Sequence, residues 1–332
     1  MKYIIIPEQK TIHQLPFYFA VEEYVARKYT NDDYFMAWRV EPTVMLGRNQ
    51  LIENEVNIDY CKRNNIHIFR RKSGGGCIYA DKGCMQFSYI SFAENVNSAF
   101  IEYMKSIAEM IKSLGINTEL SGRNDILVDG KKVAGSAFYR LKGRSVLHNS
   151  LLFSTQLEHL SQALTPGKEK LQSKGVASVR QRVTNVGTYT TLNIEAFMAY
   201  VRQYMCGNEV LELTPDDMQQ IAEIEKELAS DNFIYGKNPK YTEVRKKRFA
   251  DVGTIQAHIE LKNNKIVNIN LMGDYFLSGD LDNELLNLLH GVDFSREAVA
   301  NAIEGVEMGN VIRNFTTEQF LRLLFGRPPH VM

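Results

Sequence analysis

Hydrophobic residues recur along the chain at two spacings, one typical of helices and one typical of strands. Helical spacing predicts three long helices, over residues 16–29, over residues 97–114 and from Thr214 to about Asp231. Strand-like alternation predicts extended segments between them, at residues 1–7, 34–47, 66–92, 124–139 and 145–153. The mixture of both periods predicts an α/β (α+β) fold with mixed β-sheets and packed helices.

The polar residues at the ends of the predicted helices agree with this division. Gly115 follows the second helix and marks its end, because glycine readily ends a helix. Thr214 precedes Pro215, Asp216 and Asp217, which gives a capping hydroxyl, a proline in the first turn and two acids at the positive end of the helix dipole. We therefore expect a well-defined helix start at Thr214.

A second, smaller unit follows a connector over residues 233–248, where Gly236, Asn238 and Pro239 interrupt both spacings. Two alternating runs at residues 255–261 and 266–271 flank Asn263 and Asn264, which predicts a β-hairpin. Helical patterns follow at residues 282–290, 295–304 and 316–324. The pattern predicts a large domain over residues 1–244 and a small α/β domain over residues 245–332, which offers few candidate catalytic residues.

Composition narrows the classes of partner. The chain has 332 residues, enough for two domains, with 44% hydrophobic and 23% charged residues. Basic and acidic residues are equal at 39 each, so the overall charge favours neither nucleic acid nor an anionic membrane. The four cysteines show no Cys-x-x-Cys spacing, and no apolar run approaches membrane-spanning length. The first residues are too short and too soon interrupted for a signal peptide, so we expect a cytoplasmic protein without disulfides or zinc.

The most unusual segment runs Arg70-Arg71-Lys72-Ser73-Gly74-Gly75-Gly76, between strand-like runs at residues 66–69 and 85–90. Three successive glycines give up side-chain packing and cost backbone entropy, so they favour a turn that something approaches closely. The adjacent cations would suit an anionic ligand with a bulky tail. An ordinary glycine-rich hairpin tip remains an alternative. A Walker phosphate loop is excluded, because no Gly-Lys-Ser/Thr follows and no helix opens after the glycines.

A second chemical cluster surrounds Asp129-Gly130, a dipeptide typical of a two-residue hairpin turn. Such a turn pairs Val128 with Lys131 and Leu127 with Lys132, and it sets Asp125 opposite Ala134. Asp125 and Lys132 then become diagonal neighbours on one face. The small residues at 134–137 leave room for a ligand lying flat across the strands. A surface ion pair on a hairpin is the alternative interpretation.

A third cluster, residues 170–182, carries four cations with glycine and serine between them. Such a run is either a solvated basic loop or a segment that brings N–H groups and positive charge over a phosphate. Taken together, three basic, glycine-containing segments indicate a polyphosphate site, with Mg²⁺ held partly by Asp125.

At these residues the chain closely resembles lipoate–protein ligases of the bacterial two-domain type. The matching motifs are Arg70–Tyr79, Ser121–Asp125 with Lys132–Ala137, and Ser173–Gly175 with Ser178–Asn185. The likeness extends to Gly47-Arg48-Asn49-Gln50 and to Gly273-Asp274-Tyr275-Phe276, so it covers nearly the whole chain in order. It implies a biotin/lipoate-ligase catalytic domain, class II synthetase-like in fold, with a small accessory domain.

The resemblance also implies a reaction in two steps. Lipoate and ATP form lipoyl-adenylate and pyrophosphate, and a lysine of an apo lipoyl carrier domain then takes the acyl group. The implied carriers are acyltransferase subunits of 2-oxo acid dehydrogenases and the glycine-cleavage H protein. Cofactors and substrates are therefore ATP, Mg²⁺ and lipoate, and we expect a monomer.

The motifs assign roles to individual residues. We expect Lys132 to be the catalytic cation, which contacts the lipoate carboxyl group and the α-phosphate, and Asp125 to hold Mg²⁺. Residues 170–182 are expected to close over the adenylate and exclude water. The predicted substrate-binding residues are Arg71, Ser73, Gly74, Gly75, Gly76, Cys77, Ile78, Tyr79, Asn124, Asp125, Lys132, Gly135, Ser136, His148, Lys174, Gly175, Ser178, Arg180 and Arg182.

The chain departs from the family pattern at a few positions. Ala80 and Cys84 replace a usual histidine and asparagine, and Leu147-His148-Asn149 stands where His-His-Gly is common. His148 is either a ligand contact or a satisfied core histidine. Cys77 and Cys84 lie close to the predicted site, and without a partner base we expect buried, unreactive thiols.

Three other activities remain open on the same fold. One is an octanoyl- or lipoyl-transferase that forms a cysteine thioester. The second is a transferase that accepts only preformed lipoyl-adenylate, and the third is a non-catalytic lipoate-binding protein, which Lys132 disfavours.

Overall fold

The computed structural model describes residues 1–7, 12–93, 95–122, 124–164, 182–236 and 241–326. These residues form two compact units. The first contains Met1–Leu46, Ile52–Arg71 and Cys77–Gly236. The second contains the C-terminal part from Lys237 together with two short segments from the N-terminal half, Gly47–Leu51 and Lys72–Gly76.

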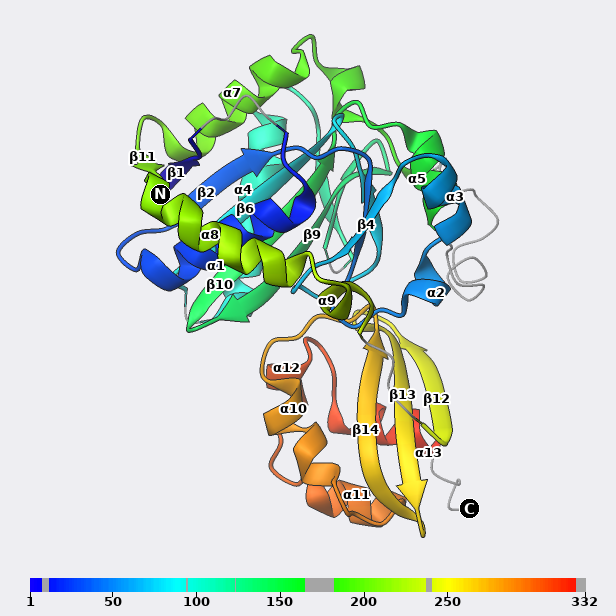
Figure 1. The fold of residues 1–332 in the computed structure, drawn as a ribbon. Coiled ribbons are helices and arrows are strands. Elements are labelled where there is room, and N and C mark those ends of the chain that lie inside the picture. Colours follow the sequence, from blue (N-terminus) through cyan, green and yellow to red (C-terminus); the bar gives the residue numbers. More distant parts are fainter. Residues whose placement is uncertain (8–11, 94, 123, 165–181, 237–240, 327–332) are drawn as a thin grey trace. The chain divides into compact units, whose positions relative to one another are not determined.

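An eight-stranded sheet forms the centre of the first unit (Figure 1). Its strands follow the order β11 (Val210–Glu212), β1 (Lys2–Ile5), β2 (Tyr34–Trp38), β6 (Cys84–Ser91), β10 (Arg144–Leu152), β9 (Lys131–Leu141), β8 (Asp125–Val128) and β7 (Glu119–Ser121). The pairs from β2 to β7 are antiparallel, whereas β1 pairs in parallel with both β2 and β11. The sheet therefore mixes both kinds of pairing, as the sequence predicts.

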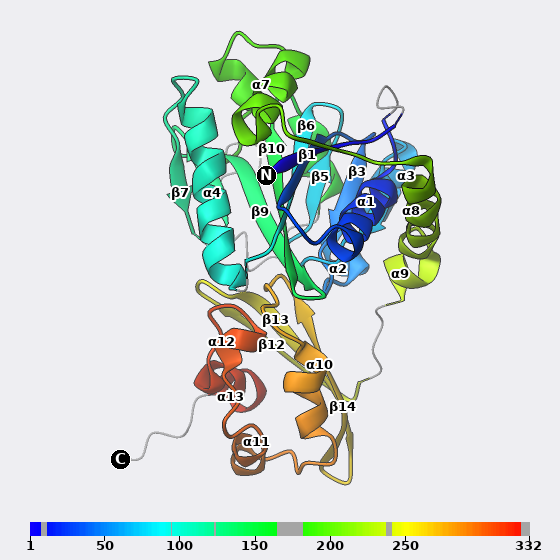
Figure 2. The same cartoon turned by 90° about the vertical axis from the view of Figure 1, so that its left-hand side faces the viewer.

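Two long helices cover opposite faces of this sheet at β9 and β10 (Figure 2). Helix α4 (Val96–Lys112) packs its Phe100 ring against Phe138, with the ring centroids 4.9 Å apart. Helix α1 (Leu15–Lys28) covers the other face, where its Phe19 stacks on His148. Because neighbouring residues of a strand point to opposite faces, these two contacts also show which face each residue of β9 and β10 occupies.

A second sheet of the first unit is small, with the order β4 (His67–Arg70), β3 (Thr43–Leu46) and β5 (Ile78–Ala80). Strand β3 lies between the other two, parallel to β4 and antiparallel to β5. The glycine-rich segment that joins β4 to β5 is therefore not the tip of a hairpin, because its flanking strands do not pair with each other. That alternative interpretation is wrong.

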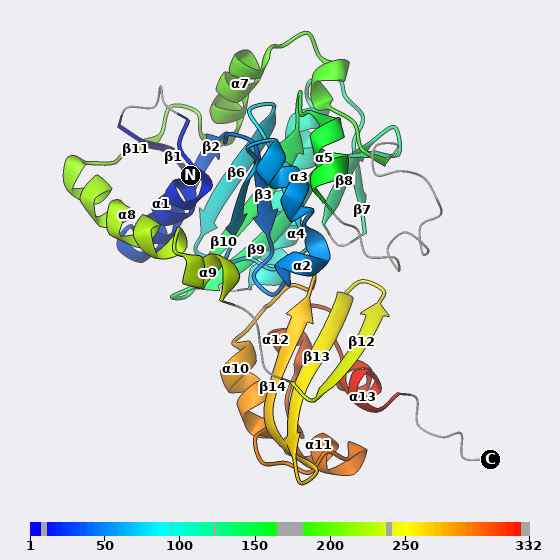
Figure 3. The same cartoon turned by 45° about the vertical axis from the view of Figure 1, so that its right-hand side comes forward.

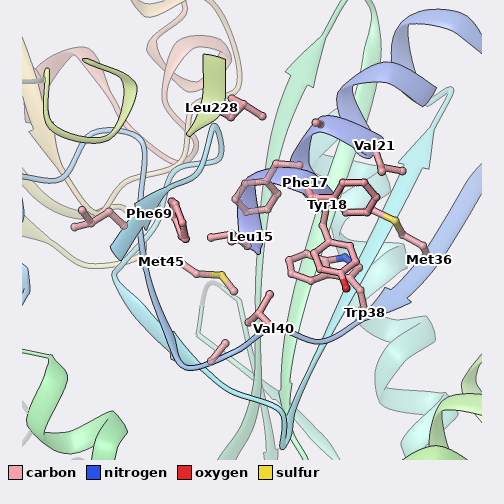
Figure 4. Packing of buried hydrophobic residues seen from close by; sticks show 14 of the residues in the cluster. Leu15, Phe17, Tyr18, Val21, Met36, Trp38, Val40, Met45, Phe69 and Leu228 are labelled. Carbon is pink, nitrogen blue, oxygen red and sulfur yellow. The ribbon is translucent and has the colours of Figure 1, made fainter. Parts of the chain in front are cut away.

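The main core lies between these elements. Figure 4 shows Leu15, Phe17 and Tyr18 of α1 packed with Trp38 of β2 and Met45 of β3. The Tyr18 and Trp38 rings stack with their centroids 4.5 Å apart. All of these side chains are buried, so the core fixes α1 against both sheets.

The remaining helices of the first unit are mostly short. They are α2 (Ile52–Glu55), α3 (Ile58–Arg63), α5 (Leu157–Ala163), the 3₁₀ turn η2 (Val186–Tyr189), α7 (Ile194–Cys206), α8 (Pro215–Leu228) and α9 (Asp231–Tyr235). Helix α8 begins as predicted, since the Thr214 hydroxyl accepts from the Asp217 N–H and the Asp217 carboxylate accepts from the Thr214 N–H. Tyr24 and Lys28 of α1 also donate to the Asp217 carboxylate, which joins the two helices.

The second unit is a three-stranded antiparallel sheet with helices packed on one face (Figure 3). Its elements are β12 (Glu243–Phe249), β13 (Gly253–Lys262), β14 (Lys265–Gly273), α10 (Leu281–Glu284), η3 (Leu286–Leu289), α11 (Arg296–Ala302), α12 (Met308–Val311) and α13 (Thr317–Phe325). The predicted hairpin is confirmed, with Asn263 and Asn264 both at positive φ in its turn. No helix among the described residues is both long and apolar enough to span a membrane.

Two local predictions for this unit are wrong. The expected connector includes strand β12, whose exposed cations are compatible with an edge strand that has only one neighbour. The expected helix over residues 282–290 is instead a four-residue helix followed by a 3₁₀ turn, because the chain leaves helical geometry at Leu285, with φ −137°.

Candidate active site

The β8–β9 hairpin forms the turn that the sequence predicts. Asp129 and Gly130 both have positive φ, 50° and 71°, as a type I′ turn requires. Val128 pairs with Lys131 and Leu127 with Lys132, also as predicted. One pairing prediction is wrong: Asp125 lies opposite Gly135, not Ala134. A β-bulge between Ile126 and Leu127 adds one residue on β9 and shifts the register beyond it.

The hairpin nevertheless brings the predicted acid and base together. Lys132 Nζ lies 2.6 Å from Asp125 Oδ1, and about a third of each side chain is exposed (34% and 29%). Both groups are therefore held in place yet accessible to a ligand. An ammonium in this position can meet a second anion while the carboxylate meets a cation, so the pair can hold two oppositely charged parts of one substrate complex.

Gly135 provides the space for the lysine amine. A Cβ atom at this position would lie 2.7 Å from Lys132 Nζ and 3.0 Å from Lys132 Cε. The Lys132 side chain thus lies against the backbone of β9 at Gly135. It occupies the same face of the sheet as His148, since Gly135 and Ala137 share a face and Ala137 pairs with His148.

Asn124 and Ser136 are joined to each other by two hydrogen bonds. The Ser136 N–H donates to the Asn124 carbonyl at 2.8 Å, and Asn124 Nδ2 donates to the Ser136 carbonyl at 2.7 Å. These contacts hold Asn124, the residue before Asp125, against β9. The Ser136 side chain is buried on the opposite face from Gly135, where its hydroxyl accepts from Asn149 Nδ2 at 2.9 Å.

His148 is part of a buried polar chain. Its Nε2 lies 2.6 Å from Glu22 Oε2, and the Glu22 carboxylate also accepts from the Ser88 hydroxyl. Trp38 Nε1 donates to the same hydroxyl at 2.8 Å. The histidine therefore has a firm partner within the core. Contact between His148 and a substrate stays a prediction.

Arg182 is the only predicted residue of the third cluster within the described part of the chain. It precedes Val183, which bridges Lys132 in parallel, and Thr184 N–H donates to the Lys132 carbonyl at 3.0 Å. Arg182 Nε is buried and has no hydrogen-bond partner among the described residues. The predicted residues Lys174, Gly175, Ser178 and Arg180 lie outside the described residues.

Arg71 is a buried cation at the end of β4. Its side chain is 5% exposed, and Nη1 donates to the Met45 carbonyl at 3.0 Å. Burial lowers the pKa of Arg71 to about 10, so the guanidinium stays charged at neutral pH. A buried, charged guanidinium is well suited to hold an anion.

The segment Cys77-Ile78-Tyr79 enters β5. Cys77 and Ile78 are half-buried, whereas Tyr79 is buried and its hydroxyl lies 3.4 Å from Asp81 Oδ2. Asp81 also accepts from the N–H groups of Gly83 and Gln156, which ties β5 to the start of α5. Burial raises the pKa of Asp81. The Tyr79 side chain belongs to the core, so only its backbone is placed to border a ligand.

The four remaining predicted residues, Ser73, Gly74, Gly75 and Gly76, belong to the second unit. The Gly75 N–H donates to the Tyr275 carbonyl at 3.0 Å, and a Cβ on Gly74 would lie 2.2 Å from the same oxygen. The Gly273 N–H donates to the Asn49 carbonyl at 2.8 Å, and Arg48 N–H donates to the Ser73 carbonyl at 2.9 Å. Three motifs that are distant in the sequence thus share one hydrogen-bonded arrangement.

Three of the four cysteines give no support to a thioester mechanism. Cys61, Cys84 and Cys206 are buried, and burial raises their pKa values to about 11, 12 and 11. Cys84 is held by Gln86 Nε2, which donates to its sulfur at 3.1 Å. A protonated thiol is a poor nucleophile, so these three are structural. Cys77 is half-buried.

Sequence reasoning did not assign three polar residues that support the site. Asn149 contacts Ser136, Asp81 anchors β5, and Asn185 exchanges two hydrogen bonds with the Thr155 backbone. Asn185 fixes the stretch that runs beside Lys132. Asn149 and Asn185 have partners distant in the chain, and Asp81 accepts from distant Gln156 as well as from nearby Gly83, so no local spacing pointed to these roles.

Among the described residues of the predicted site, Asp125 is the carboxylate available to a divalent cation. Within the described residues, no group of three or more His, Cys, Asp or Glu side chains could hold a metal ion. Mg²⁺ commonly uses one or two carboxylates together with substrate phosphates and water, so Asp125 fits Mg²⁺ only alongside a nucleotide.

Two family models match the chain. The model for the lipoyl protein ligase A/B catalytic domain matches residues 15–206, and that for the bacterial lipoate protein ligase C-terminus matches residues 238–324. Among solved structures, P. falciparum LipL1 in complex with lipoate has a similar fold, with a TM-score of 0.73 at 19% identity, covering 96% of each chain. A lipoate-protein ligase A bound with ATP gives a TM-score of 0.60 at 24% identity, covering 71% of this chain and 98% of that one.

Curated relatives agree with the family models over nearly the full length. Lipoate-protein ligase LplJ of Bacillus subtilis is 34% identical over 92% of this chain and 95% of its own. Lipoate–protein ligase 1 of Staphylococcus aureus is 34% identical over 85% of this chain and 89% of its own. The expected fold class and family are therefore confirmed. With its paired lysine and carboxylate, its two matched domains and these relatives, the chain belongs to the lipoate–protein ligase family.

Proposed function

We propose that this ligase activates lipoate with ATP at the Lys132–Asp125 pair and then transfers the lipoyl group to a lysine of an apo lipoyl carrier domain. In the first step the lipoate carboxylate attacks the α-phosphorus of ATP, the bond to the β-phosphate breaks, and pyrophosphate leaves. In the second step the neutral carrier amine attacks the acyl carbon, the bond between the acyl carbon and AMP breaks, and the nitrogen loses one proton to water as the amide forms. Atoms and charge balance without any oxidant or reductant.

The first step brings two anions together, and Lys132 supplies the compensating charge. Its ammonium moves from the Asp125 carboxylate to the lipoate carboxylate and the α-phosphate, which lie beside each other in the transition state. A fixed cation stabilises that state more than the separated reactants, because negative charge accumulates between them. Because Gly135 has no side chain, the Lys132 amine has room to move from Asp125 to the substrates.

Asp125 has the complementary role. When Lys132 turns to the substrate, the carboxylate becomes available to Mg²⁺, whose remaining ligands are phosphate oxygens and water. Mg²⁺ would reduce the charge of the leaving pyrophosphate. In this proposal, Lys132 and Asp125 pair with each other before the substrates bind, and each then changes partner, Lys132 to the substrates and Asp125 to Mg²⁺.

The other predicted residues complete this proposal. Arg71 binds the nucleotide through its buried guanidinium, and Gly74–Gly76 border the lipoyl tail. The proposed substrate-binding set further comprises Ser73, Cys77, Ile78, Tyr79, Asn124, Gly135, Ser136, His148, Lys174, Gly175, Ser178, Arg180 and Arg182. In functional terms we divide the chain into a catalytic domain, 1–244, and an accessory domain, 245–332.

The partners follow from the same chemistry. We propose that the ligase acts in the cytoplasm, where ATP is available to it. The proposed carriers are acyltransferase subunits of 2-oxo acid dehydrogenases and the glycine-cleavage H protein. We propose that the ligase acts as a monomer.

The observation that carries the proposal is the 2.6 Å contact between Lys132 and Asp125 above a glycine that leaves room for the amine. Intact-mass spectrometry of an apo carrier domain incubated with lipoate, Mg²⁺, ATP and this protein tests it. We expect the mass of one lipoyl group to be added, and only when ATP is present. Modification from prepared lipoyl-adenylate but not from lipoate and ATP would overturn the activation step. A parallel reaction with octanoate defines the acyl preference.

A further inference from the structure

We propose that Asn149 is a positioning residue for the Asp125–Lys132 pair, and this proposal rests on the function proposed above. Asn149 lies in the middle of β10 and is 1% exposed. It pairs with Ser136 on one neighbouring strand and with Phe87 on the other. It lies on the face covered by α4, opposite the face where Lys132 lies, so it cannot touch the substrates there directly.

Hydrogen bonds, together with the covalent link from Asn124 to Asp125, connect Asn149 to the ion pair. Asn149 Nδ2 donates to the Ser136 hydroxyl at 2.9 Å. The backbone of Ser136 is held by two bonds to Asn124, at 2.8 and 2.7 Å. Asn124 directly precedes Asp125, whose carboxylate holds Lys132 at 2.6 Å. Each link is short, and the first three residues are fixed by secondary structure or by their partners.

Asn149 is an energetically costly residue for its location. Its Oδ1 atom is buried and has no hydrogen-bond partner among the described residues. The residues two positions away on the same face, Leu147 and Leu151, are fully buried and apolar. An unsatisfied buried acceptor costs about 1–3 kcal/mol, whereas an apolar side chain would avoid that cost. Packing alone therefore does not account for an asparagine here.

The β-bulge explains why β8 needs this support. The register shift between Ile126 and Leu127 interrupts the regular ladder directly beyond Asp125. The bonds between Asn124 and Ser136 therefore hold the end of β8 that carries the carboxylate. If Ser136 shifts, Asn124 shifts with it, and the direction of the Asp125 carboxylate changes. Asn149 limits this movement from the other side of the sheet.

The test compares Asn149→Ala, Ser136→Ala and the double variant with a matched control, Ser145→Ala. Ser145 is buried on the same face of β10, and its hydroxyl donates to the Ala93 carbonyl, away from the ion pair. The readouts are lipoate-dependent ATP–pyrophosphate exchange as a function of Mg²⁺ concentration, transfer from prepared lipoyl-adenylate, and thermal unfolding.

We expect Asn149→Ala to raise the Mg²⁺ concentration for half-maximal exchange by about tenfold, the factor that corresponds to the net free energy of one hydrogen bond among the contacts that orient Asp125. Transfer from lipoyl-adenylate should change much less, because it needs no Mg²⁺ in this proposal. The double variant should be no worse than either single one, because both remove the same contact. Ser145→Ala should keep the wild-type Mg²⁺ dependence.

A purely structural role gives a different result. Asn149→Ala would then lower the unfolding temperature, while its exchange kinetics well below that temperature would match those of Ser145→Ala, and the proposal would be wrong. If Asn149→Ala does not fold, Ser136→Ala decides alone, since it removes the same bond from the acceptor side and the Ser136 hydroxyl lies on the face opposite to Lys132, so that only the backbone of Ser136 could border a substrate. Failure of the proposed function is distinct, because the wild-type protein would then show no lipoate-dependent exchange.

Discussion

The β8–β9 hairpin and the triple-glycine segment are both rich in small residues and cations, yet their glycines serve different partners. Gly135 leaves room for a side chain of its own strand, because a Cβ there would meet the Lys132 amine. Gly74 leaves room for main chain from a distant part of the sequence, because a Cβ there would meet the Tyr275 carbonyl oxygen. One glycine accommodates a flexible functional group, and the other accommodates a rigid structural one.

The comparison shows that glycine content alone does not identify a ligand site. In the hairpin, the amine beside Gly135 can move away and make space for a substrate. In the glycine segment, the carbonyl beside Gly74 also accepts a hydrogen bond from Gly75 and belongs to the fold of the second unit. The same sequence signal, a bare backbone beside cations, therefore accompanies a movable side chain in one region and a fixed backbone contact in the other.

Lys132→Ala should have the largest effect, because it removes the cation that we propose stabilises the transition state. We expect lipoate-dependent ATP–pyrophosphate exchange to fall about a thousandfold, the usual loss for a group that stabilises transition-state charge. Lys131→Ala is the control, since Lys131 is exposed at the turn and points to the other face. Equal exchange in Lys132→Ala and wild type would mean that the chemistry lies elsewhere.

Gly135→Ala tests whether the hairpin glycine acts through the lysine. The added methyl group must displace Lys132 Nζ, which would lie 2.7 Å away. We expect exchange to fall about thirtyfold with little loss of stability, because the amine is the flexible end of a side chain and a displaced charge loses only part of its effect. In the double variant with Lys132→Ala, the glycine change should add nothing further. An additional loss there would assign Gly135 to direct contact with substrate.

These two regions also show how far the sequence could predict the site. The Asp129-Gly130 turn fixed the pairing of Lys132 by local rules, so the contact between Lys132 and Asp125 could be predicted. The bulge could not, because no local signal marks an extra residue in one strand of a ladder. The register of Asp125 therefore differs by one residue, although the ion pair survives.

The tertiary partners were beyond sequence reasoning for a similar reason. Nothing near Gly74 indicates Tyr275, and nothing near Asn149 indicates that Ser136 depends on it. Strand β12 was missed because exposed cations on an edge strand have the composition of a connector. The long helices α1, α4 and α8 were predictable, since each carries an apolar face and a recognisable start or end.

Gly74→Ala should affect stability more than Gly135→Ala does, which is the sharpest test of the comparison. The methyl group would lie 2.2 Å from the Tyr275 carbonyl oxygen, and a backbone atom cannot move aside as a lysine amine can. We expect a loss of about 2 kcal/mol in the free energy of unfolding, as for overpacking in a well-packed region. Hydrogen exchange at residues 273–276 should become faster.

Gly309→Ala is the matched control for that experiment. Gly309 lies in helix α12 of the same unit, and the nearest atom to an added Cβ is 3.9 Å away. It should leave both stability and exchange unchanged or slightly improved, since alanine favours a helix. If Gly74→Ala keeps full protection at 273–276, the Tyr275 backbone does not require the glycine and the contrast with Gly135 is wrong, whatever happens to lipoate binding.

Cys84→Ala should have the smallest effect on activity, and its pH dependence separates a structural thiol from a reactive one. Burial raises the pKa of Cys84 from 9.0 to about 12, so the native state holds its proton where the unfolded chain has lost it. The unfolded state then binds fewer protons than the native state, and the stabilising effect of Cys84 falls as the pH rises from about 9 to 12. The stability difference between wild type and Cys84→Ala, measured by denaturant unfolding, should therefore decrease over that range.

Lipoylation rates of the two proteins should match at neutral pH. Intact mass after incubation with lipoate and ATP should reveal no hydroxylamine-sensitive acyl adduct on the wild-type chain. An adduct that disappears in Cys84→Ala would make the thiol a nucleophile and replace the lysine-centred chemistry with a thioester route.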